Sequence, residues 1–563
     1  MLSRIYGICQ RNVNSCVVSS KFCTYFEEPT YIKFDKNVEN SEFDKPKKKI
    51  PIITCKRSKY NYYQGQNYPK FAPLPLASDG WHIRKSKGDY FTINPINEDI
   101  QESNENRETI TFKDLGVSDK LVENLRKQFE IKTPTTIQRD GIPVILEQQN
   151  VKLLAETGCG KTFAYLLPLI DQIFNWKEKI ERNFNHPLAL IITPSRELSI
   201  QIGKVAMLLT KDLNIRTKVV IGGGIKSKIS NPPASNVDII IGTIGAISKH
   251  TTIGIYKMKY VRHVVLDEAD SLFDETFYEK VRYFLQKITF GPLKEFSEGF
   301  PKYSQLTLVS ATMPQFIDDF LENIVDLSSL EEIATDKVHR VNVLQKFLRL
   351  GVQQKPMTLL RLIKSKAKNK IPVIVFCNSG KTCDWVCQFL NEFEVRSIRL
   401  NGDMPLYKRK NKFREFYIGV YNVLCTTDAG ARGLDTIMVK DVINFDFPLQ
   451  TSEYIHRCGR TARVGSPKDC RVINFVSRTL EIQLTQKIER AVKLNKPLPM
   501  CDYLKKNWTL SKEDERQYRL DEKRDKQNIK ENFQYFPDNS PKDLIENTFE
   551  IDDKEDFVKN ERH

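Results

Sequence analysis

Residues 155–162 read AETGCGKT, a short Gly-rich segment. It follows an apolar run and opens the helical stretch FAYLLPLIDQIF. A Gly-rich loop between a strand and a helix can hold phosphate groups, because its main-chain amides and the helix N-terminus point at them. We expect Lys161 to neutralise phosphate oxygens and Thr162 to place its hydroxyl on Mg²⁺. The candidate nucleotide-binding residues of the loop are Ala155, Glu156, Thr157, Gly158, Cys159, Gly160, Lys161 and Thr162. Ala155 stands where the general pattern has its first Gly.

Apolar runs alternate with amphipathic stretches on the C-terminal side of this loop. The first series is LALIITP near 188, KVVIGG near 218, VDIIIGT near 237, HVVLDEAD near 263 and LTLVSAT near 306. The second series begins after about residue 340 and comprises PVIVFCN, RSIRLNG, NVLCTTD, DVINFDF and CRVINFVS. Buried parallel strands have this pattern when helices lie between them. The sequence therefore predicts an α/β protein with two tandem parallel-sheet domains, at residues 108–332 and 340–497.

The regions outside these domains have a different composition. Residues 29–107 are rich in Lys, Asn, Pro and Tyr without a lasting apolar period, so most of this N-terminal extension is expected to be extended or disordered. Pro69–Ile93, with Trp81 and Tyr90, is a candidate for docking on the body. Residues 498–563 form a charged tail, for which a solvated chain is favoured over a helix.

The first 28 residues have the composition of a mitochondrial transit peptide. They contain Arg4, Arg11 and Lys21, several Ser, and no acid before Glu27. An ordinary disordered terminus is the alternative. The basic run of residues 45–49, KPKKK, is a competing nuclear signal, but it is short and common. The predicted location is the mitochondrial matrix, with the nucleus or nucleolus as the alternative.

Composition limits the class of protein. The 563 residues carry 87 Lys and Arg against 71 acids, a net charge of +16, which favours phosphate-rich partners or serves solubility alone. The 12 cysteines are scattered without CxxC pairs, which indicates a reducing compartment. Cys383 and Cys387 are four residues apart, and helix packing explains them better than zinc binding. No apolar run approaches the roughly 20 residues that span a bilayer, so we expect a soluble protein.

Residues 267–270 place carboxylates directly after the run HVVL. Ligands bind at this edge of parallel sheets. We expect Asp267 to hold Mg²⁺, through water, and Glu268 to orient and deprotonate an attacking water. Without the phosphate loop, the same four residues would equally well be a solvated helix start.

With both motifs in hand, the chain from about Thr111 to Leu498 resembles the DEAD-box RNA helicases, a family with two RecA-like domains that uses ATP and Mg²⁺. The motifs occur in the family's order. Residues 134–138, PTTIQ, are similar to the family's Q motif. The resemblance implies that Gln138 reads the adenine edge and Phe112 stacks on the ring; without it, Phe112 would be assigned to the core. Residues 310–312, SAT, resemble the motif that links hydrolysis to strand separation.

Two segments of the second domain match further family motifs, at residues 427–435, TDAGARGLD, and 456–463, HRCGRTAR. By resemblance, Asp435 touches the ribose, while Arg460 and Arg463 reach the γ-phosphate when the domains close. A surface salt bridge is the alternative for any single Arg. The predicted catalytic residues are Lys161, Asp267, Glu268, Arg460 and Arg463.

A third group of residues falls where the family contacts the sugar-phosphate backbone of RNA. The predicted RNA-binding residues are Pro194, Ser195, Arg196, Gly223, Gly224, Thr243, Gly245, Gly402, Arg409 and Thr426. None would read a base, so recognition should not depend on sequence. Ala246 and Leu406 replace a usual Arg and a usual Gln, so the core is expected to grip RNA less tightly than typical relatives do.

These features predict an ATP-dependent RNA helicase with a monomeric core that clamps RNA when ATP binds and opens short duplexes locally. An RNA-binding scaffold with a vestigial ATPase and a DNA translocase are the competing hypotheses. Within the family, the N-terminus, the segment ASDGWHIRKSKGDYF and the short tail look like the animal mitochondrial member linked to large-ribosomal-subunit assembly. That resemblance implies mitochondrial large-subunit rRNA and ribosomal assembly proteins as partners.

Overall fold

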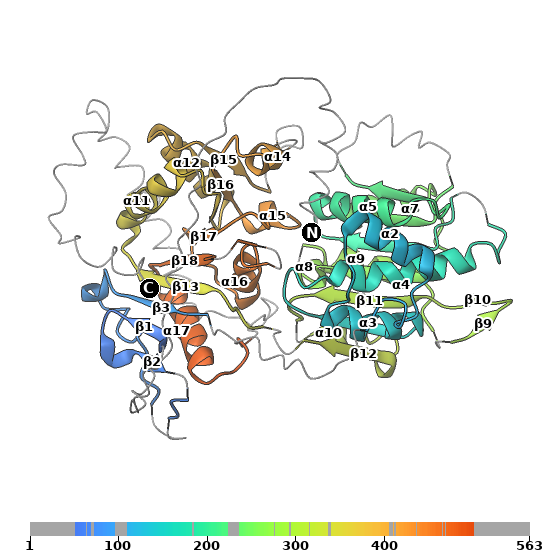
Figure 1. The fold of residues 1–563 in the computed structure, drawn as a ribbon, viewed down its shortest axis with the longest axis horizontal. Helices are drawn as coiled ribbons and strands as arrows, with labels where there is room; N and C mark the ends of the chain where they lie inside the picture. The colour runs from blue at the N-terminus through green and yellow to red at the C-terminus, as the bar shows by residue number, and fades with distance from the viewer. Residues whose placement is uncertain are drawn as a thin grey trace, which may run out of the picture.

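The computed structural model shows two α/β domains next to each other (Figure 1). It describes residues 51–63, 65–68, 73–95, 110–182, 185–222, 236–274, 276–291, 294–314, 316–335, 339–402, 404, 409, 412–434, 436–463, 466–467 and 469–499. The predicted transit peptide and residues 500–563 of the predicted tail lie outside this part of the chain. Within it, no helix is both long enough and apolar enough to cross a membrane.

The first domain is built around a seven-stranded parallel sheet with the order β12-β4-β11-β8-β5-β7-β6. Its strands are β4 (Asn150–Leu154), β5 (Ala189–Thr193), β6 (Thr217–Val220), β7 (Ile239–Thr243), β8 (His263–Asp267), β11 (Gln305–Ser310) and β12 (Leu330–Ala334). Its helices are α2 (Asp119–Phe129), α3 (Thr136–Leu146), α4 (Lys161–Trp176), α5 (Arg196–Leu209), α7 (Ile244–Thr252), α8 (Ala269–Leu272), α9 (Tyr278–Leu285) and α10 (Ile317–Leu321). A short hairpin, β9 (Phe296–Ser297) and β10 (Phe300–Pro301), projects from the domain.

The second domain has a parallel sheet with the order β15-β16-β14-β17-β18-β13. Its strands are β13 (Leu344–Arg349), β14 (Val373–Phe376), β15 (Ser397–Leu400), β16 (Val423–Thr426), β17 (Asp441–Asn444) and β18 (Arg471–Val476). Its helices are α11 (Lys355–Lys368), α12 (Gly380–Glu392), α14 (Lys412–Tyr417), α15 (Asp428–Ala431), α16 (Thr451–Cys458) and α17 (Thr479–Lys493). The ten apolar runs that predicted strands are β5, β6, β7, β8, β11 and β14 to β18, so the predicted fold class is confirmed.

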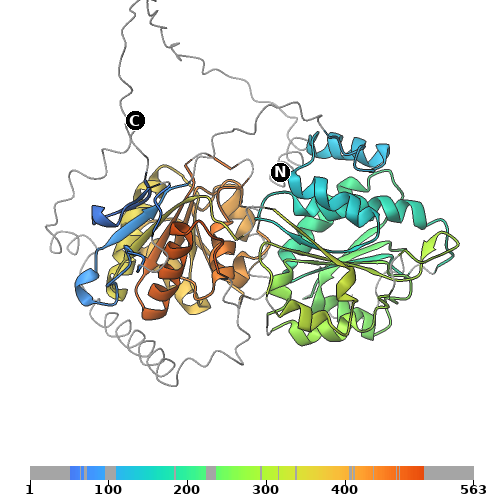
Figure 2. The ribbon, with the colours of Figure 1, turned by 90° about the horizontal axis from the view of Figure 1, so that it is seen from below.

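Part of the N-terminal region, which we expected to be mostly extended or disordered, is folded in the structure. Three strands, β1 (Pro51–Cys55), β2 (Tyr62–Tyr63) and β3 (Tyr90–Ile93), extend the second sheet to nine strands. β3 pairs antiparallel with β13, and β1 pairs with β3. Figure 2 shows this segment against the second domain, close to α17. The segment covers an edge that would otherwise expose unpaired main-chain groups.

Side chains fix the N-terminal segment in place. The Trp81 side chain is completely buried, and its ring lies 5.5 Å from that of Phe91, which stacks on Phe347 of β13 at 4.6 Å. The Arg349 Nε donates to the Trp81 carbonyl at 2.7 Å. Sequence reasoning did select Trp81 as part of a docking segment. The order of the strands could not be read from it, because β3 and β13 are more than 250 residues apart in the chain.

A buried ion pair on α17 completes this docking. Glu489 and Lys493 are 3.1 Å apart and fully buried. The Glu489 carboxylate accepts hydrogen bonds from the amides of Ala77 and Ser78, at 2.6 and 3.1 Å, and Lys493 donates to the Pro75 carbonyl at 2.6 Å. Buried charges are tolerated when they are paired and hydrogen-bonded in this way. The segment is therefore an integral part of the second domain.

Candidate functional site

The phosphate loop joins β4 to α4 at the carboxyl edge of the first sheet. Gly160, directly before the helix, has φ +96°, a backbone conformation that favours Gly. The Lys161 Nζ donates to the carbonyls of Ala155 and Glu156, at 2.5 and 2.8 Å, so its ammonium lies under the loop. Thr162 follows on the first turn of the helix and is half-buried. The loop and its Lys have the geometry that phosphate binding requires.

Of the two predicted adenine-binding residues, Gln138 lies beside this loop. Gln138 is buried; its Oε1 accepts from the Thr135 amide and its Nε2 donates to the Gly160 carbonyl, both at 3.0 Å. Reading adenine requires that Gln138 exchange at least one of these bonds for the base. Phe112 is only 1% exposed and belongs to the core cluster of the first domain. Its packing here matches the core assignment, and stacking on a base would need its ring to be uncovered.

The two carboxylates after β8 differ in their environments. Asp267 is buried, and its Oδ2 accepts a hydrogen bond from the hydroxyl of Tyr165 at 2.8 Å. Burial, and then the neighbouring Glu268, raises the pKa of Asp267 to about 6. Glu268 has φ +50°, uncommon for a residue with a side chain, and its Oε2 is buried without a hydrogen-bond partner among the described residues. Tyr165, one turn after Thr162, was missed by sequence reasoning because it reads as a core residue of α4.

These residues fit a divalent cation. A buried carboxylate with a raised pKa and a second acid beside it is more stable as an anion when positive charge is added. The carboxylate of Asp267 and the hydroxyl of Thr162 are hard oxygen donors of the kind Mg²⁺ prefers. Among the described residues no group of three or more His, Cys, Asp or Glu could hold a metal by itself. The donor set suits an ion that shares its coordination with substrate phosphates.

The second domain brings two arginines to this site. The Arg460 Nη2 lies 3.7 Å from Glu268 Oε1, and its Nη1 donates to the Leu434 carbonyl at 3.1 Å. Arg463 packs against the phosphate loop, because a Cβ on Gly158 would lie 3.2 Å from the Arg463 Cβ. The structure therefore brings all five predicted catalytic residues together where the two domains meet.

Gly459 allows this close approach. The Thr157 hydroxyl donates to the Gly459 carbonyl at 3.2 Å, and any Cβ on Gly459 would collide with Thr157. The absence of a side chain at this one position lets the second domain contact the phosphate loop.

A polar network crosses the cleft beside Glu268. Asp270 accepts hydrogen bonds from the hydroxyl of Thr312 and interacts with His456 of the second domain, whose Nε2 is 2.5 Å from Asp270 Oδ2. Burial alone would raise the pKa of Asp270, but His456 and the hydroxyls lower it well below its usual range. Burial would lower the pKa of His456, and Asp270 raises it above its usual value. Sequence reasoning included Asp270 and Thr312 in motifs but did not identify this pair.

Arg457 has a positioning role that the sequence did not reveal. It is almost completely buried; its Nε and Nη2 donate to the two carboxylate oxygens of Asp428 at 2.7 and 2.6 Å, and Nη2 also donates to Asn378 Oδ1. This bidentate pair ties α16 to α15. It holds α16, and Arg460 and Arg463 lie in the segment that directly follows this helix.

The predicted RNA-binding residues of the first domain follow β5 and β7. Ser195 caps α5, accepting from the Leu198 amide, and its hydroxyl donates to the Arg432 carbonyl of the second domain, both at 3.2 Å. Arg196 is half-buried beside Pro194. Thr243 precedes α7, and Gly245 is exposed with open space where a Cβ would lie. Gly223 and Gly224 lie outside the described residues.

Two predicted RNA-binding residues of the second domain have partners within the protein in this structure. Thr426 is completely buried, and its hydroxyl donates to the Leu400 carbonyl at 2.6 Å. Its side chain is therefore not accessible to RNA in this structure. The Arg409 guanidinium instead pairs with Glu197 of the first domain at 2.8 Å. Gly402 is exposed, as its predicted role needs. Asp435 and Leu406 lie outside the described residues.

Ala246, which stands in place of a usual Arg, is buried in the structure. It is 7% exposed and packs in a hydrophobic cluster of the first domain, with Ile244 and Ile247. A surface contact with RNA cannot simply be restored there, because an Arg would have to displace this packing.

Comparisons with known proteins identify the family of the chain. Residues 135–320 match the DEAD/DEAH box helicase family, and residues 354–465 match the helicase conserved C-terminal domain. The protein named "Probable ATP-dependent RNA helicase DDX28" is 34% identical in Mus musculus over 80% of this chain and 85% of that protein, and 33% identical in Homo sapiens over the same shares. A structure of S. cerevisiae Dbp5 bound to RNA and ADP BeF3 has a TM-score of 0.57 at 24% identity, over 68% of this chain and 93% of the other.

The chain thus belongs to the DEAD-box family and is an ATP-dependent RNA helicase. The likeness to Dbp5 independently supports the fold of two RecA-like domains.

Proposed function

We propose that the protein is an RNA-dependent ATPase that clamps the RNA backbone when ATP joins its two domains and releases it after hydrolysis. The observation that carries this proposal is the meeting of Arg460 with Glu268 across the cleft. A base for water and a cation for the γ-phosphate must come from different domains, so only closure around one nucleotide completes the site.

In this mechanism each residue has one task. The amides of the phosphate loop and Lys161 bind the β and γ phosphates, and Gln138 holds the adenine edge. Glu268 orients the attacking water and accepts its proton. Arg460 and Arg463 stabilise the charge that develops on the transferred phosphoryl group. Tyr165 positions Asp267 through the hydrogen bond at 2.8 Å.

Mg²⁺ would be held by Thr162 and Asp267, and when bound it would neutralise the phosphate oxygens. The raised pKa of Asp267, about 6, supports this assignment, since a cation would restore the ionised form.

For RNA, the exposed Gly245 and Gly402 and the half-buried Arg196 and Thr243 are the residues that best fit backbone contacts. Such contacts do not read bases. Strand separation should therefore be local: closure bends one strand, and the neighbouring base pairs break.

We further propose that the protein acts in the mitochondrial matrix on large-subunit rRNA with ribosomal assembly proteins. The basic, Ser-containing residues 1–26, which lack acids, support the location. The net charge of +16 suits a large RNA. Crosslinking the protein to RNA in cells and sequencing the bound RNA tests the target, and recovery of only nuclear or cytosolic RNA would contradict it.

The enzymatic proposal is tested by ATPase assays with and without RNA. RNA should stimulate hydrolysis strongly, and Arg460→Ala should reduce the stimulated rate by about 10³-fold or more, the usual effect of an arginine finger. RNA binding without measurable ATP hydrolysis would favour the scaffold hypothesis instead, and hydrolysis that does not respond to RNA would contradict the proposal.

A further inference from the structure

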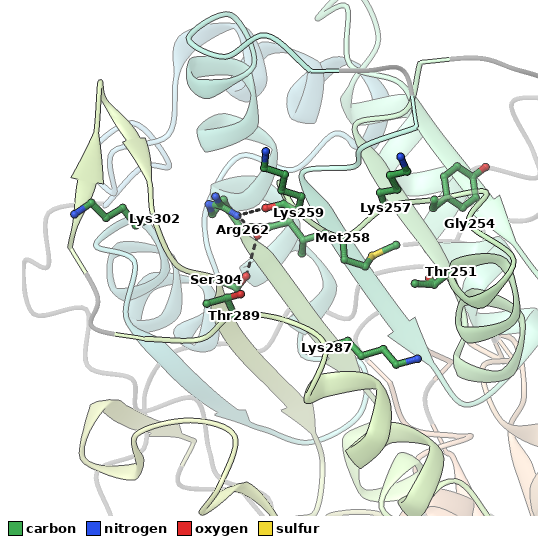
Figure 3. Close-up of a pocket in the computed structure, with 12 residues that line it drawn as sticks. Thr251, Gly254, Lys257, Met258, Lys259, Arg262, Lys287, Thr289, Lys302 and Ser304 are labelled. Atoms are coloured by element: carbon green, nitrogen blue, oxygen red, sulfur yellow. Dashed lines mark hydrogen bonds between the residues drawn. The ribbon is translucent and has the colours of Figure 1, made fainter.

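A basic pocket lies on the first domain, away from the cleft between the domains (Figure 3). Its volume is about 410 Å³. Arg262 directly precedes β8 and Ser304 directly precedes β11, so the pocket lies at the amino edge of the sheet. The nucleotide site lies at the carboxyl edge, about 15 Å away along a five-residue strand. No motif of the family reaches the pocket.

Five cations line this pocket: Lys257, Lys259, Arg262, Lys287 and Lys302. None of the described residues that line it is an acid. Lys302 is paired with Glu295 at 3.4 Å, whereas no carboxylate in the described part of the chain pairs with the other four cations. The result is an unbalanced positive surface, which attracts phosphate groups.

The hydrogen bonds that Arg262 donates within the protein go to neutral main-chain carbonyls and not to a carboxylate. Its Nε donates to the Pro301 carbonyl at 2.5 Å, and its Nη1 donates to the carbonyls of Lys259 and Val261 at 3.0 and 2.7 Å. Burial without an acid lowers the pKa of Arg262 to about 10. An anion in the pocket would compensate this desolvation.

The arrangement of the lysines favours an extended polyanion over one compact anion. In Figure 3 the side chains of Lys257, Lys259, Lys287 and Lys302 point outward in different directions and do not converge on one point. A single small phosphate could meet only one or two of them. A chain of phosphates that crosses the pocket could meet several.

Aromatic rings lie among these cations. Tyr256 lines the pocket, and Tyr283 on α9 is 62% exposed, with the Lys287 Nζ 4.2 Å from its ring centroid. Unpaired bases can stack on exposed rings next to lysines. A duplex keeps its bases stacked inside and could not use Tyr283 in this way.

We propose that this pocket, with its lysines and Tyr283, is a second binding surface for single-stranded RNA, which holds the backbone of a segment outside the clamp. The inference rests on the proposed RNA helicase function and adds a site at the opposite edge of the first domain. It would keep the protein on a long RNA while the clamp opens and closes.

The test uses the full chain with Lys257, Lys259 and Lys287 all changed to Gln. The matched control changes Lys364, Lys368 and Lys370, three exposed lysines of the second domain, to Gln. Affinity is measured at several salt concentrations for single-stranded RNAs of about 10 and about 40 nucleotides, since short RNAs fill one site and long RNAs reach two. ATPase activity with the short RNA reports whether the clamp is intact.

We expect the pocket variant to bind the long RNA about tenfold or more weakly at 0.1 M salt, with a salt slope smaller by about 2 for three lost contacts. Short-RNA affinity and the ATPase activity should not change, and the control should keep the long-RNA affinity. Equal losses for both lengths or for both variants would overturn the second site. If the unchanged protein neither binds RNA nor responds to it, the proposed function itself fails.

Photocrosslinking of the unchanged protein to thiouridine-containing RNA gives an independent readout. Crosslinks from the long RNA should map to residues 251–262 and 278–289. Their absence would overturn the proposal even if the variant were poorly folded. A blunt duplex that competes as well as the single strand for these crosslinks would also overturn it.

Discussion

The imidazole of His456 lies 2.5 Å from the carboxylate of Asp270, and this pair joins the second domain to the first directly beside the catalytic Glu268. The same carboxylate accepts a hydrogen bond from Thr312. Nucleotide hydrolysis and domain closure therefore share one polar network. The pair is buried, so removal of His456 would leave the buried Asp270 carboxylate without its charged partner.

The first prediction concerns the pH dependence of ATP-dependent RNA binding. Because the pKa of His456 is raised, its contribution is complete below about pH 6.5 and is lost as pH rises through the raised value. The lowered pKa of Asp270 keeps its contribution present above about pH 3.8 and removes it only in stronger acid. RNA affinity with an ATP analogue should therefore weaken as the pH rises above about 6.5.

His456→Ala should remove this pH dependence and weaken ATP-dependent RNA binding by about 2 kcal/mol or more. RNA binding without nucleotide should hardly change. His82→Ala, at an exposed position, is the control. An unchanged pH profile in the His456 variant would rule out the pair as its cause.

The second prediction concerns Glu268. The change Glu268→Gln keeps the shape of the side chain but cannot accept a proton, so kcat for ATP should fall by about 10²-fold or more while ATP still binds. RNA should be held longer, because the closed state is not released. Single-turnover hydrolysis and RNA dissociation rates measure both effects. Normal ATP turnover, or an RNA affinity that ATP does not increase, would contradict the assigned role.

The third prediction concerns the N-terminal strands. Trp81→Ala should destabilise the second domain by about 3–5 kcal/mol, since the ring is completely buried against Phe91. Hydrogen exchange in β13 and α17 should rise, while exchange in the first domain stays the same. His82→Ala again serves as the exposed neighbour. Equal stability of the two variants would mean that the segment does not support the domain.

The fourth prediction concerns location. Deletion of residues 1–28 should leave ATPase activity and RNA binding unchanged, because no motif lies there, but should keep the protein out of mitochondria. Imaging of tagged full-length and truncated chains compares them directly. Import of the truncated chain would count against a transit peptide.

The fifth prediction concerns strand separation. One nucleotide cleft allows one closure per ATP, so base pairs outside the clamp must melt unaided. Each further step adds about 1.4 kcal/mol, and a few extra pairs should slow opening by orders of magnitude. The unwinding rate is measured against duplex length, with the overhang at either end. Opening that is independent of length and strict in polarity would indicate translocation.

The positions of the buried strands, and the polar residues at their carboxyl ends, could be predicted from the sequence alone. Apolar runs such as HVVL at 263–266, which alternate with amphipathic stretches, favour buried parallel strands, and polar residues directly after such strands share the carboxyl edge of the sheet. Lys161, Asp267 and Glu268 follow from that local logic. For each of them, the residues that indicate its chemistry and its place in the fold lie within a few positions of it in the sequence.

Tertiary structure decided what depends on partners far away in the chain. Thr426 and Arg409 have suitable side chains for RNA, yet one is buried under Leu400 and the other pairs with Glu197. Trp81 reads as an isolated aromatic until β3 is placed beside β13. The hydrogen bonds and the burial at such sites come from contacts between domains or between residues that are far apart in the sequence. Local propensity does not predict these contacts, because they form only when the chain packs.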